Sequence, residues 1–231
     1  MAFTFAQGKN LLLGSAQAIK ELAKKDEAKV LVISDSHGSS ENFLSALLEQ
    51  GPSCDALVFC GDGIRDLAAC LGYIPLDSKV REAMPAVIAM VQGNNDCSVY
   101  PFRNPDYSKE KKNDYFIELK IPLQNTLCIC GHKVFVTHGH RYSLYRGLEE
   151  LGNAAVKEKA SIVLYGHTHV ALSCWYANTL LLNPGSIARP RGGQKKTYAL
   201  LTLRKDADFA DFTFFSLGYP KSSPYVPKLE F

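Results

Sequence analysis

Residues 29–37 read KVLVISDSH, an apolar run followed directly by polar and charged side chains. A continuous apolar run without alternating polar residues is typical of a strand that is covered on both faces. Helical spacing follows over residues 39–50, and Gly51-Pro52 ends that helix. The chain therefore opens with a buried strand and a helix that packs against it.

Two more apolar runs, residues 56–60 and 86–91, repeat the pattern downstream. The segment between them, residues 64–85, has helical character with a break at Pro75. This alternation of strands and helices predicts a largely parallel sheet with right-handed crossovers. The first 27 residues are rich in Ala, Lys and Leu at helical spacing, which predicts an amphipathic helix lying on the domain.

The second half of the chain is rich in predicted strands. A long polar surface loop is expected over residues 98–113, a turn at Gly131-His132, a helix over residues 142–159 and an extended tail from Gly218. The predicted strands cover residues 115–119, 126–130, 133–137, 161–165, 170–176, 179–182, 197–203 and 211–217.

No repeat, low-complexity segment or linker divides the chain. With 231 residues, of which 46% are hydrophobic and 21% charged, we expect one large globular domain. We divide it into an N-terminal helical extension (residues 1–28), a core (29–204), and a C-terminal strand and tail (205–231).

Charge and cysteine content narrow the classes of function. A formal net charge of +3 is nearly balanced and gives no electrostatic reason to expect a dedicated nucleic-acid or membrane-surface protein. No apolar stretch has the length of a membrane span, and residues 1–10 lack the pattern of a signal peptide. Seven cysteines, several of them in apolar runs, indicate reduced thiols and a cytoplasmic location.

Cys128 and Cys130 lie two residues apart in a predicted strand, which would point both thiols to one face. No second pair of cysteines has the spacing of a zinc finger. We therefore expect buried thiols here, rather than a metal or redox site.

Five short polar clusters each follow a predicted strand, and together they contain five of the six histidines of the chain. Ligands in open α/β folds bind where loops leave the ends of strands, so these clusters are expected to lie along one edge of the sheets. Imidazole, carboxylate and carboxamide groups repeated in that position are typical of a multi-metal site. The clusters are Asp35-Ser36-His37-Gly38, Gly61-Asp62-Gly63, Gly93-Asn94-Asn95-Asp96, Thr137-His138-Gly139-His140 and Gly166-His167-Thr168-His169.

The clusters supply seven candidate ligands, or four per metal if the two carboxylate oxygens of Asp62 bridge two ions. Nitrogen and oxygen ligands without thiolate suit manganese, iron, zinc, cobalt or nickel better than calcium, and manganese is our first expectation. Two dications with two aspartates leave a positive site that attracts phosphate oxygens and holds a bridging hydroxide. The seven candidates are Asp35, His37, Asp62, Asn94, His138, His167 and His169.

Taken in order, the motifs Asp-x-His, Gly-Asp, Gly-Asn-x-Asp, His-Gly-His and Gly-His-Thr-His resemble those of the calcineurin-like metallophosphoesterase superfamily. The short chain is similar to the small bacterial and archaeal phosphodiesterase branch, to which the retromer scaffold subunit is related. Asn183-Pro184-Gly185-Ser186 is a further trait of that family, and the resemblance covers about residues 29–204. It implies an α/β fold: a four-layer α-β-β-α sandwich of two mixed β-sheets flanked by helices.

The resemblance also implies how the ligands divide between two divalent ions. One ion would take Asp35, His37, Asp62 and His169, and the other would take Asp62, Asn94, His138 and His167. In this family the position of Asp96 supports a nearby histidine or the site without binding metal.

Asn95 departs from the better-known members of the family, many of which have a histidine there that protonates the leaving group. A carboxamide does not donate a proton as an imidazolium does. Loss of general-acid help typically costs a factor of roughly 10² to 10⁴, and less when the leaving group is already a good one. The residue therefore favours substrates with good leaving groups over proteins or nucleic acids.

These observations predict a metal-dependent phosphodiesterase in which a metal-bridging hydroxide attacks a small phosphorylated substrate. The residues expected to act in catalysis are Asp62, Asn94, His138 and His140. The alternative is a scaffold or adaptor that kept the fold and lost turnover, although such a protein should have lost ligands that this chain retains. A DNA-processing nuclease would call for a basic groove or an added capping domain, and the sequence indicates neither. A homo-oligomer is compatible with the sequence, which does not determine the oligomeric state.

Other polar residues carry two interpretations. His140 is equally consistent with a phosphate or metal contact and with packing beside His138. Arg65, Arg189 and Arg191 each have two possible roles, to neutralise a phosphate oxygen or to lie on the surface. For Arg65 we favour the surface position. His132 is expected to be a solvated turn residue, and Trp175 a strand residue that fills core or edge space.

Overall fold

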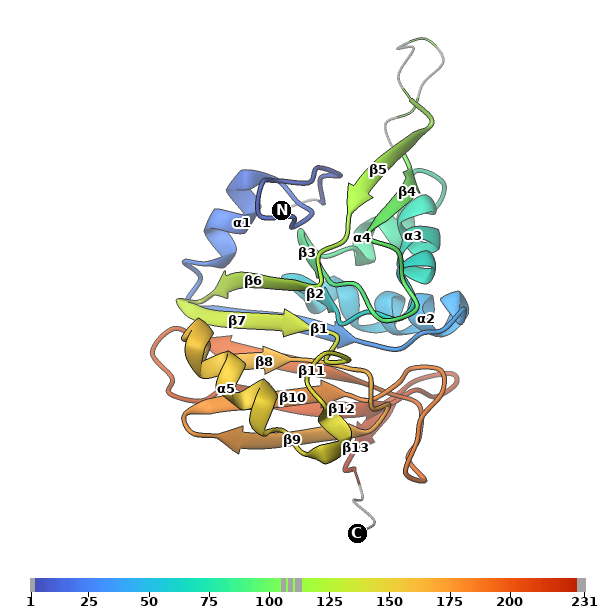
Figure 1. The fold of residues 1–231 in the computed structure, drawn as a ribbon. Helices are drawn as coiled ribbons and strands as arrows, with labels where there is room; N and C mark the ends of the chain where they lie inside the picture. Colours follow the sequence, from blue (N-terminus) through green and yellow to red (C-terminus); the bar gives the residue numbers. More distant parts are fainter. Residues whose placement is uncertain (1–2, 105–106, 108–109, 111–113, 228–231) are drawn as a thin grey trace.

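Two β-sheets pack face to face in the computed structural model, which describes residues 3–104, 107, 110 and 114–227 (Figure 1). The strands are β1 (Glu27–Ile33), β2 (Ala56–Phe59), β3 (Val87–Met90), β4 (Val99–Arg103), β5 (Phe116–Lys120), β6 (Gln124–Ile129), β7 (His132–Thr137), β8 (Ile162–Leu164), β9 (Ala171–Tyr176), β10 (Thr179–Pro184), β11 (Thr197–Arg204), β12 (Asp211–Ser216) and β13 (Ser223–Tyr225). The helices are α1 (Ala16–Leu22), α2 (Ser40–Gln50), α3 (Ile64–Gly72), α4 (Ser78–Ala83) and α5 (Glu149–Glu158), with short 3₁₀ turns η1 (Gly51–Ser53) and η2 (Leu144–Arg146).

Both large sheets are mixed. The six-stranded sheet has the order β13-β12-β11-β1-β2-β3, and the five-stranded sheet has the order β6-β7-β8-β10-β9. β1, β2 and β3 are parallel to one another, as are β7, β8 and β10, so within each sheet these strands end at the same edge. A separate two-stranded sheet, β4-β5, projects from the body of the molecule (Figure 1).

The alternation along β1 explains why its apolar run is continuous. Val30 and Val32 lie in the core between the two sheets, whereas Leu31 and Ile33 lie in the core beneath α2, α3 and α4. All four side chains are fully buried, and burial of one such side chain contributes about 1.5–3 kcal/mol. A third core, which contains Phe135, packs the five-stranded sheet against α5. The four-layer sandwich is therefore confirmed.

The N-terminal helix is shorter than predicted, because Gly14 (φ +133°) interrupts the segment before α1. Leu13 instead forms an isolated antiparallel bridge with Ile88 of β3. Ala18 and Leu22 of α1 belong to the core between the sheets. Leu13 and α1 thus close one end of the sandwich.

Two predicted elements were wrong in their extent. Part of the expected loop over residues 98–113 is strand β4, which pairs with β5, while residues 105–106, 108–109 and 111–113 lie outside the described residues. The helix predicted over residues 142–159 is divided into η2 and α5, because Ser143 (φ +47°) and Gly147 (φ +129°) take left-handed backbone conformations.

The turn between β6 and β7 also differs from the prediction. Cys130 (φ +50°) and Gly131 (φ +82°) form it, and Cys130 therefore leaves the strand alternation. Cys128 is exposed and Cys130 is buried, so the expectation of two buried thiols was wrong. His132 is the first residue of β7 and its Nε2 donates to the Arg204 carbonyl at 2.8 Å, so it is no turn residue.

The tail adds a strand that the sequence did not predict. β13 pairs with β12, and the carboxylate of Glu49 accepts hydrogen bonds from the backbone N–H and the hydroxyl of Ser222. Trp175 lies half exposed on edge strand β9, where its ring packs against that of Phe209.

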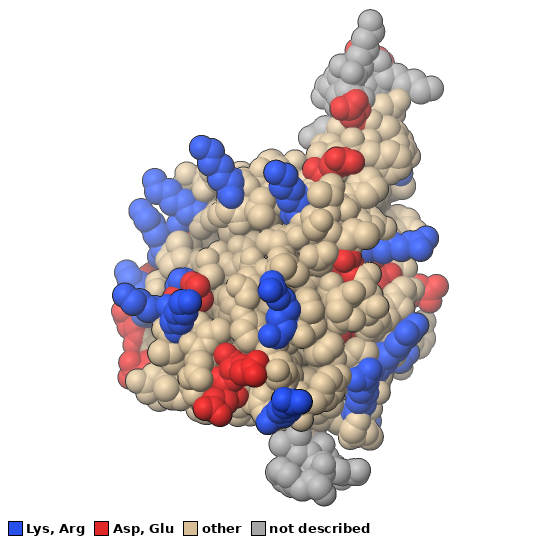
Figure 2. Space-filling model, in the orientation of Figure 1, with Lys and Arg blue, Asp and Glu red and all other residues tan. Residues whose placement is uncertain are grey.

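Positive and negative side chains are interspersed over the face of the molecule in Figure 2, with lysine and arginine side chains gathered at its upper left. That region corresponds to α1 in Figure 1. Among the described residues, no helix is long and apolar enough to cross a membrane.

Candidate metal centre

The five polar clusters meet at the edge where the parallel strands of both sheets end. Asp35 and His37 follow β1, Asp62 follows β2, and His138 follows β7. The other members, Asn94 and His167 with His169, follow β3 and β8. Because β1 and β2 belong to one sheet and β7 and β8 to the other, the site lies across both sheets.

Five of the seven candidate ligands have left-handed backbone conformations. A non-glycine residue in this region costs of order 1 kcal/mol or more and persists where the surrounding structure imposes it. The five are Asp35 (φ +55°), His37 (φ +42°), Asp62 (φ +58°), His167 (φ +70°) and His169 (φ +61°). Such strain, repeated at one edge, marks a functional site.

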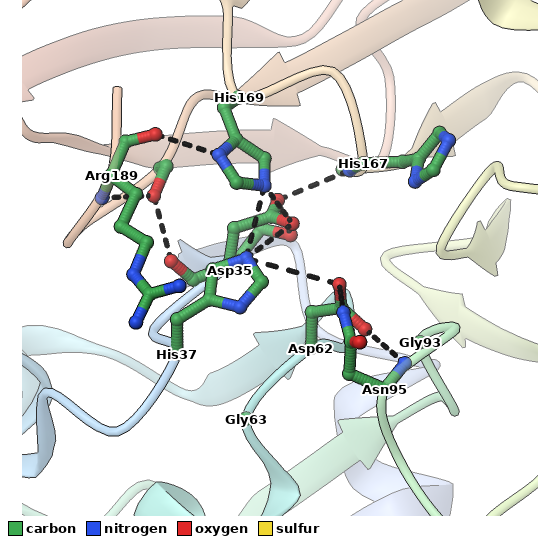
Figure 3. Close-up of polar contacts among 12 residues, drawn as sticks. Asp35, His37, Asp62, Gly63, Gly93, Asn95, His167, His169 and Arg189 are labelled. Atoms are coloured by element: carbon green, nitrogen blue, oxygen red, sulfur yellow. Dashed lines mark hydrogen bonds and ion pairs between the residues drawn. The ribbon is translucent and has the colours of Figure 1, made fainter. Parts of the chain in front are cut away.

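Asp35 is the centre of the cluster (Figure 3). Its Oδ1 lies 3.2 Å from Nε2 of His169, 3.8 Å from Nε2 of His37 and 3.9 Å from Nε2 of His138. Asp62 approaches from β2, with its Oδ2 3.5 Å from Nε2 of His138 and 3.8 Å from Nε2 of His37. Two triads of ligand atoms result, Asp35–His37–His169 and Asp35–Asp62–His138.

Hydrogen bonds on the far side of two rings set their tautomers. Nδ1 of His138 lies 2.7 Å from the Cys60 carbonyl, and Nδ1 of His169 lies 2.6 Å from the Arg189 carbonyl. A carbonyl oxygen only accepts, so each Nδ1 must carry the proton. In the neutral rings the lone pairs of Nε2 therefore point into the cluster, which is how metal-binding histidines are usually oriented.

The cluster fits divalent cations, because several of its electron-rich atoms face one another. Oδ1 of Asp35 is buried and has no hydrogen-bond partner among the described residues. Nε2 of His138 lies 3.2 Å from Oδ1 of Asn94, and the Nε2 atoms of His37 and His169 lie 3.0 Å apart. Buried acceptors without donors are costly, and a shared positive charge removes that cost.

Electrostatics of the cluster favour positive charge at its centre. Burial disfavours ionised Asp62, but the hydrogen bond and charge of His138 in its protonated form, together with the hydrogen bonds from Asn95, outweigh burial and hold the Asp62 pKa well below its usual range. Burial would lower the pKa of His138, but the hydrogen bond to Asp62 and the charges of Asp35 and Asp62 raise it. For His37 and His167 burial prevails and lowers the pKa, which favours the neutral, metal-binding form.

His167 is the candidate ligand that the structure places apart from the triads. Its ring lies edge-on to that of His138, with centroids 5.2 Å apart, and turns away from Asp35 in Figure 3. Its backbone N–H donates to Oδ2 of Asp35 at 3.1 Å. The loop is thus bonded to the cluster, while the ring stands beside it.

Asn95 holds Asp62 from the side opposite the histidines. Its backbone N–H donates to Oδ1 of Asp62 at 2.8 Å, and its side-chain Nδ2 donates to Oδ2 at 2.7 Å. Gly93 packs against the same carboxylate so closely that an added Cβ would lie 2.1 Å from Oδ1. The Gly93-Asn94-Asn95 segment therefore encloses Asp62.

A further aspartate, Asp96, shapes the loop that carries Asp62. Asp96 accepts hydrogen bonds from the backbone N–H groups of Asp62 (2.7 Å), Gly63, Ile64 and Gly93 (each 3.0 Å). It therefore supports the site through the Asp62 loop, and not through a histidine.

Asp66 is a functional residue that was not predicted from the sequence. This buried residue accepts from the Ser36 hydroxyl at 2.6 Å and the Gly38 N–H at 2.9 Å, and so fixes the loop of His37. The available signal was an acidic residue in the first turn after Gly61-Asp62-Gly63, where it reads as an ordinary helix start.

His140 lies at the margin. Its ring centroid is 5.5 Å from that of His138 and 6.2 Å from that of His167. Its Nδ1 is buried without a hydrogen-bond partner among the described residues. Burial and the neighbouring His138 lower its pKa. Arg65, in contrast, lies exposed on α3, as expected for a surface arginine.

A cleft of about 500 Å³ opens over the cluster. Its floor includes His37, Asp62 and His169, and Tyr145, Arg189 and Arg191 line another part of it. The guanidinium of Arg189 turns toward His37 in Figure 3. Tyr145 and Pro190 also line the cleft, and the sequence did not indicate either; Tyr145 lay within a predicted helix.

Comparisons with known proteins identify the family of this chain. A family described as "Calcineurin-like phosphoesterase superfamily domain" matches residues 28–206. A Bacillus subtilis protein named probable metallophosphoesterase YsnB is 30% identical over 180 residues, which cover 77% of this chain and 86% of the relative. Phosphodiesterase YfcE of Escherichia coli is 30% identical over 182 residues, which cover 75% and 86%.

The fold recurs in solved structures as well. Vacuolar protein sorting 29 from Cryptosporidium parvum superposes with a TM-score of 0.61 at 17% identity. The match covers 88% of this chain and 100% of the other. At that identity the likeness establishes a common fold.

Proposed function

This chain belongs to the calcineurin-like phosphoesterase superfamily and is a metal-dependent phosphoester hydrolase, and we propose that it is a phosphodiesterase with a binuclear metal centre. The resemblance read from the motifs is thus confirmed at the level of the family. The observation that carries the finer proposal is the convergence of Asp35, Asp62 and three histidines where both sheets end.

The residues present suggest how two ions would be held. Asp35, His37 and His169, with Asp62 at their side, would hold one. The other would take Asp62, His138, Asn94 and His167, the last after rotation of a ring that now lies beside His138. Manganese stays our first expectation. Divalent ions there would neutralise phosphate oxygens and make water a stronger nucleophile.

The chain's own residues prepare this chemistry. Cys60 and Arg189 fix the tautomers of His138 and His169 through their carbonyls, so no reorientation of those rings is needed. Asn95 holds Asp62 and supplies no acidic proton. A leaving group must then depart with little protonation, which favours diesters whose leaving group is a weak base.

The rival interpretation, a scaffold without turnover, predicts a decayed site. All seven candidate ligands are present, and six of them lie within the cluster described above. A catalytic role for His140, a cytoplasmic location and a homo-oligomer remain predictions.

The test combines metal analysis with hydrolysis of bis-p-nitrophenyl phosphate. We expect the native protein to bind two transition-metal ions and to cleave the ester, and Asp62→Ala to lower turnover by roughly 10² or more, the scale on which loss of one charge-stabilising group acts. His132→Ala is the matched control, because it removes a histidine whose partner, the Arg204 carbonyl, lies outside the cluster. Equal effects of the two substitutions, or no metal bound after addition, would contradict the proposal.

A further inference from the structure

One part of the cleft carries an aromatic ring and two arginines that have no place among the metal ligands. Tyr145, in η2, is 67% exposed although it borders the cluster. Its hydroxyl accepts a hydrogen bond from Nη1 of Arg191 at 2.7 Å. Its ring stands edge-on to His167, with centroids 5.6 Å apart. We call Tyr145, Arg189 and Arg191 the recognition wall.

The loop that carries both arginines is tied to the metal cluster. The Ser186 hydroxyl accepts from the backbone N–H of Arg189 at 2.8 Å. His169 donates from Nδ1 to the Arg189 carbonyl, and its own carbonyl accepts from the Arg191 N–H at 3.0 Å. Gln194 closes the loop by pairing with both backbone groups of Ala171. The backbone that bears the two guanidinium groups is therefore held relative to the cluster.

Among the described residues, no carboxylate forms an ion pair with an arginine of the wall. The ion pairs of Lys and Arg in the described part of the chain use Lys25, Lys133 and Arg204, and neither arginine of the wall takes part in one. A diester linkage carries a single negative charge, which the positive centre alone would balance. Two further unpaired guanidinium groups, whose forked donors match phosphate oxygens, call for additional negative charge on the substrate.

The size of the cleft and the exposed ring point to the rest of the ligand. A volume of about 500 Å³ lies in the range of pockets that hold whole small molecules, and exceeds what one phosphoryl group needs. A tyrosine ring held by its hydroxyl offers a flat surface for stacking with a planar group. We propose that the recognition wall binds the part of the substrate that is not hydrolysed, and that this part is a nucleotide. This inference rests on the proposed phosphodiesterase function.

In this arrangement each element of the ligand has its own partner. The phosphoryl group to be hydrolysed lies over the aspartate–histidine cluster, a second phosphate lies against Arg189 and Arg191, and the base stacks on Tyr145. Removal of the ring should then weaken binding roughly five-fold to hundred-fold, the range observed for base stacking on aromatic residues.

The experiment measures binding by titration calorimetry with probes that contain no phosphodiester or phosphoanhydride bond. α,β-Methylene-ADP carries two phosphorus groups and a base, methylenediphosphonate lacks the base, and AMP lacks the second phosphate. We expect the native protein to bind methylene-ADP at least about ten-fold more tightly than either of the other two, because only this probe engages the whole wall.

Substitutions separate the stacking contact of Tyr145 from the phosphate contact of Arg189 and Arg191. Tyr145→Leu should weaken methylene-ADP toward the affinity of methylenediphosphonate and leave methylenediphosphonate unchanged, whereas Tyr145→Phe should keep most of the affinity. Arg189→Gln and Arg191→Gln should weaken methylene-ADP toward the affinity of AMP. Arg146→Gln is the matched control, because it removes an exposed cation next to Tyr145 that does not line the cleft.

Equal affinities for methylene-ADP and methylenediphosphonate in the native protein, or an equal loss of both in Tyr145→Leu, would overturn the inference. Hydrolysis of bis-p-nitrophenyl phosphate is measured separately on the same preparation. Hydrolysis of the ester without tighter binding of methylene-ADP would support the phosphodiesterase function and refute the nucleotide-binding inference. Tighter binding of methylene-ADP without hydrolysis of the ester would instead refute the phosphodiesterase function.

Discussion

At the scale of single residues, the site depends on groups that orient other groups. His138 presents Nε2 to the cluster because its Nδ1 is bonded to the Cys60 carbonyl, and Asp62 accepts two hydrogen bonds from Asn95, which favour its charged form. Asp66 and Asp96 bind no ligand themselves, and they hold the backbone on which His37 and Asp62 lie. The orientation of His138, Asp62 and the His37 loop is therefore set by neighbours distant in sequence.

Asn95 allows a test of proton donation. In the native protein we expect turnover to depend steeply on the basicity of the leaving group, with aryl diesters cleaved far faster than alkyl esters. Asn95→His should help the poorest leaving groups most, by up to roughly the 10² that general-acid catalysis supplies. Rates are measured over a graded series of esters.

Asn95→Ala serves as the control for this series, since it removes the hydrogen bond from Nδ2 to Asp62 without adding an imidazole. The backbone N–H of residue 95 still reaches Oδ1 of Asp62 in both variants. A flat dependence in the native protein would mean that another group, such as His140, already donates the proton.

At the scale of elements, helix packing places the ligand loops. α2 begins at Ser40, soon after His37, and α3 begins at Ile64, soon after Asp62, so the two helices position both loops from outside the six-stranded sheet. Their contact includes Cys70 of α3, which is 1% exposed and whose Sγ lies 4.0 Å from the Ser40 carbonyl. Burial and the nearby Asp66 raise the pKa of this thiol from 9.0 to about 12.

This raised pKa makes stability depend on pH under alkaline conditions. Below pH 9 the thiol is protonated in both the folded and the unfolded chain. Above pH 9 only the unfolded chain releases the proton, so the free energy of unfolding falls by up to about 1.4 kcal/mol per pH unit until the folded pKa is reached. Cys70→Ala should therefore lose less stability between pH 8 and pH 10.5 than the native protein.

Urea unfolding at the two pH values measures the effect, and the comparison is between the two pH-dependent differences, because the substitution also removes packing at every pH. Cys97→Ala, which removes an exposed thiol, is the control. Identical pH differences in the native protein and Cys70→Ala would show that Cys70 ionises as readily in the folded chain as in the unfolded one.

At the scale of the whole molecule, the site joins the two sheets. Asp35 and Asp62 follow strands of the six-stranded sheet, and His138 and His169 follow strands of the five-stranded sheet. Their mutual distances of 3.2 to 3.9 Å therefore depend on how the sheets pack. Ions bound between these residues would link the two halves of the sandwich.

Chelation should for that reason lower the stability of the fold as a whole. A ligand present at 100 times its Kd, and bound only by the folded state, stabilises by about 2.7 kcal/mol. We expect EDTA to lower the thermal unfolding temperature and manganese to restore it, as measured by circular dichroism. Asp62→Ala should respond less to both additions. Superimposable unfolding curves with and without EDTA would contradict a metal held between the sheets.

Elements whose signal is local could be predicted from the sequence. β1, β2 and β3 appear as continuous apolar runs because both of their faces are buried, and the polar cluster after each run marks the sheet edge. The seven candidate ligands could be named from these clusters, since the order of the motifs is carried by the chain itself.

Features that depend on long-range contacts became visible in the folded chain alone. A left-handed residue, as at Cys130 or Gly147, changes the direction of the chain without changing the hydrophobic pattern around it, so the exposure of Cys128 and the division of helix 142–159 were not visible in the sequence. Tyr145 and Arg191 are 46 residues apart, and their loops meet because β7 and β10, which precede them, flank β8 in the five-stranded sheet. The sequence thus determined which groups can take part in the chemistry, whereas sheet packing determined which of them meet, because a side chain's neighbours are set by the fold and not by its place along the chain.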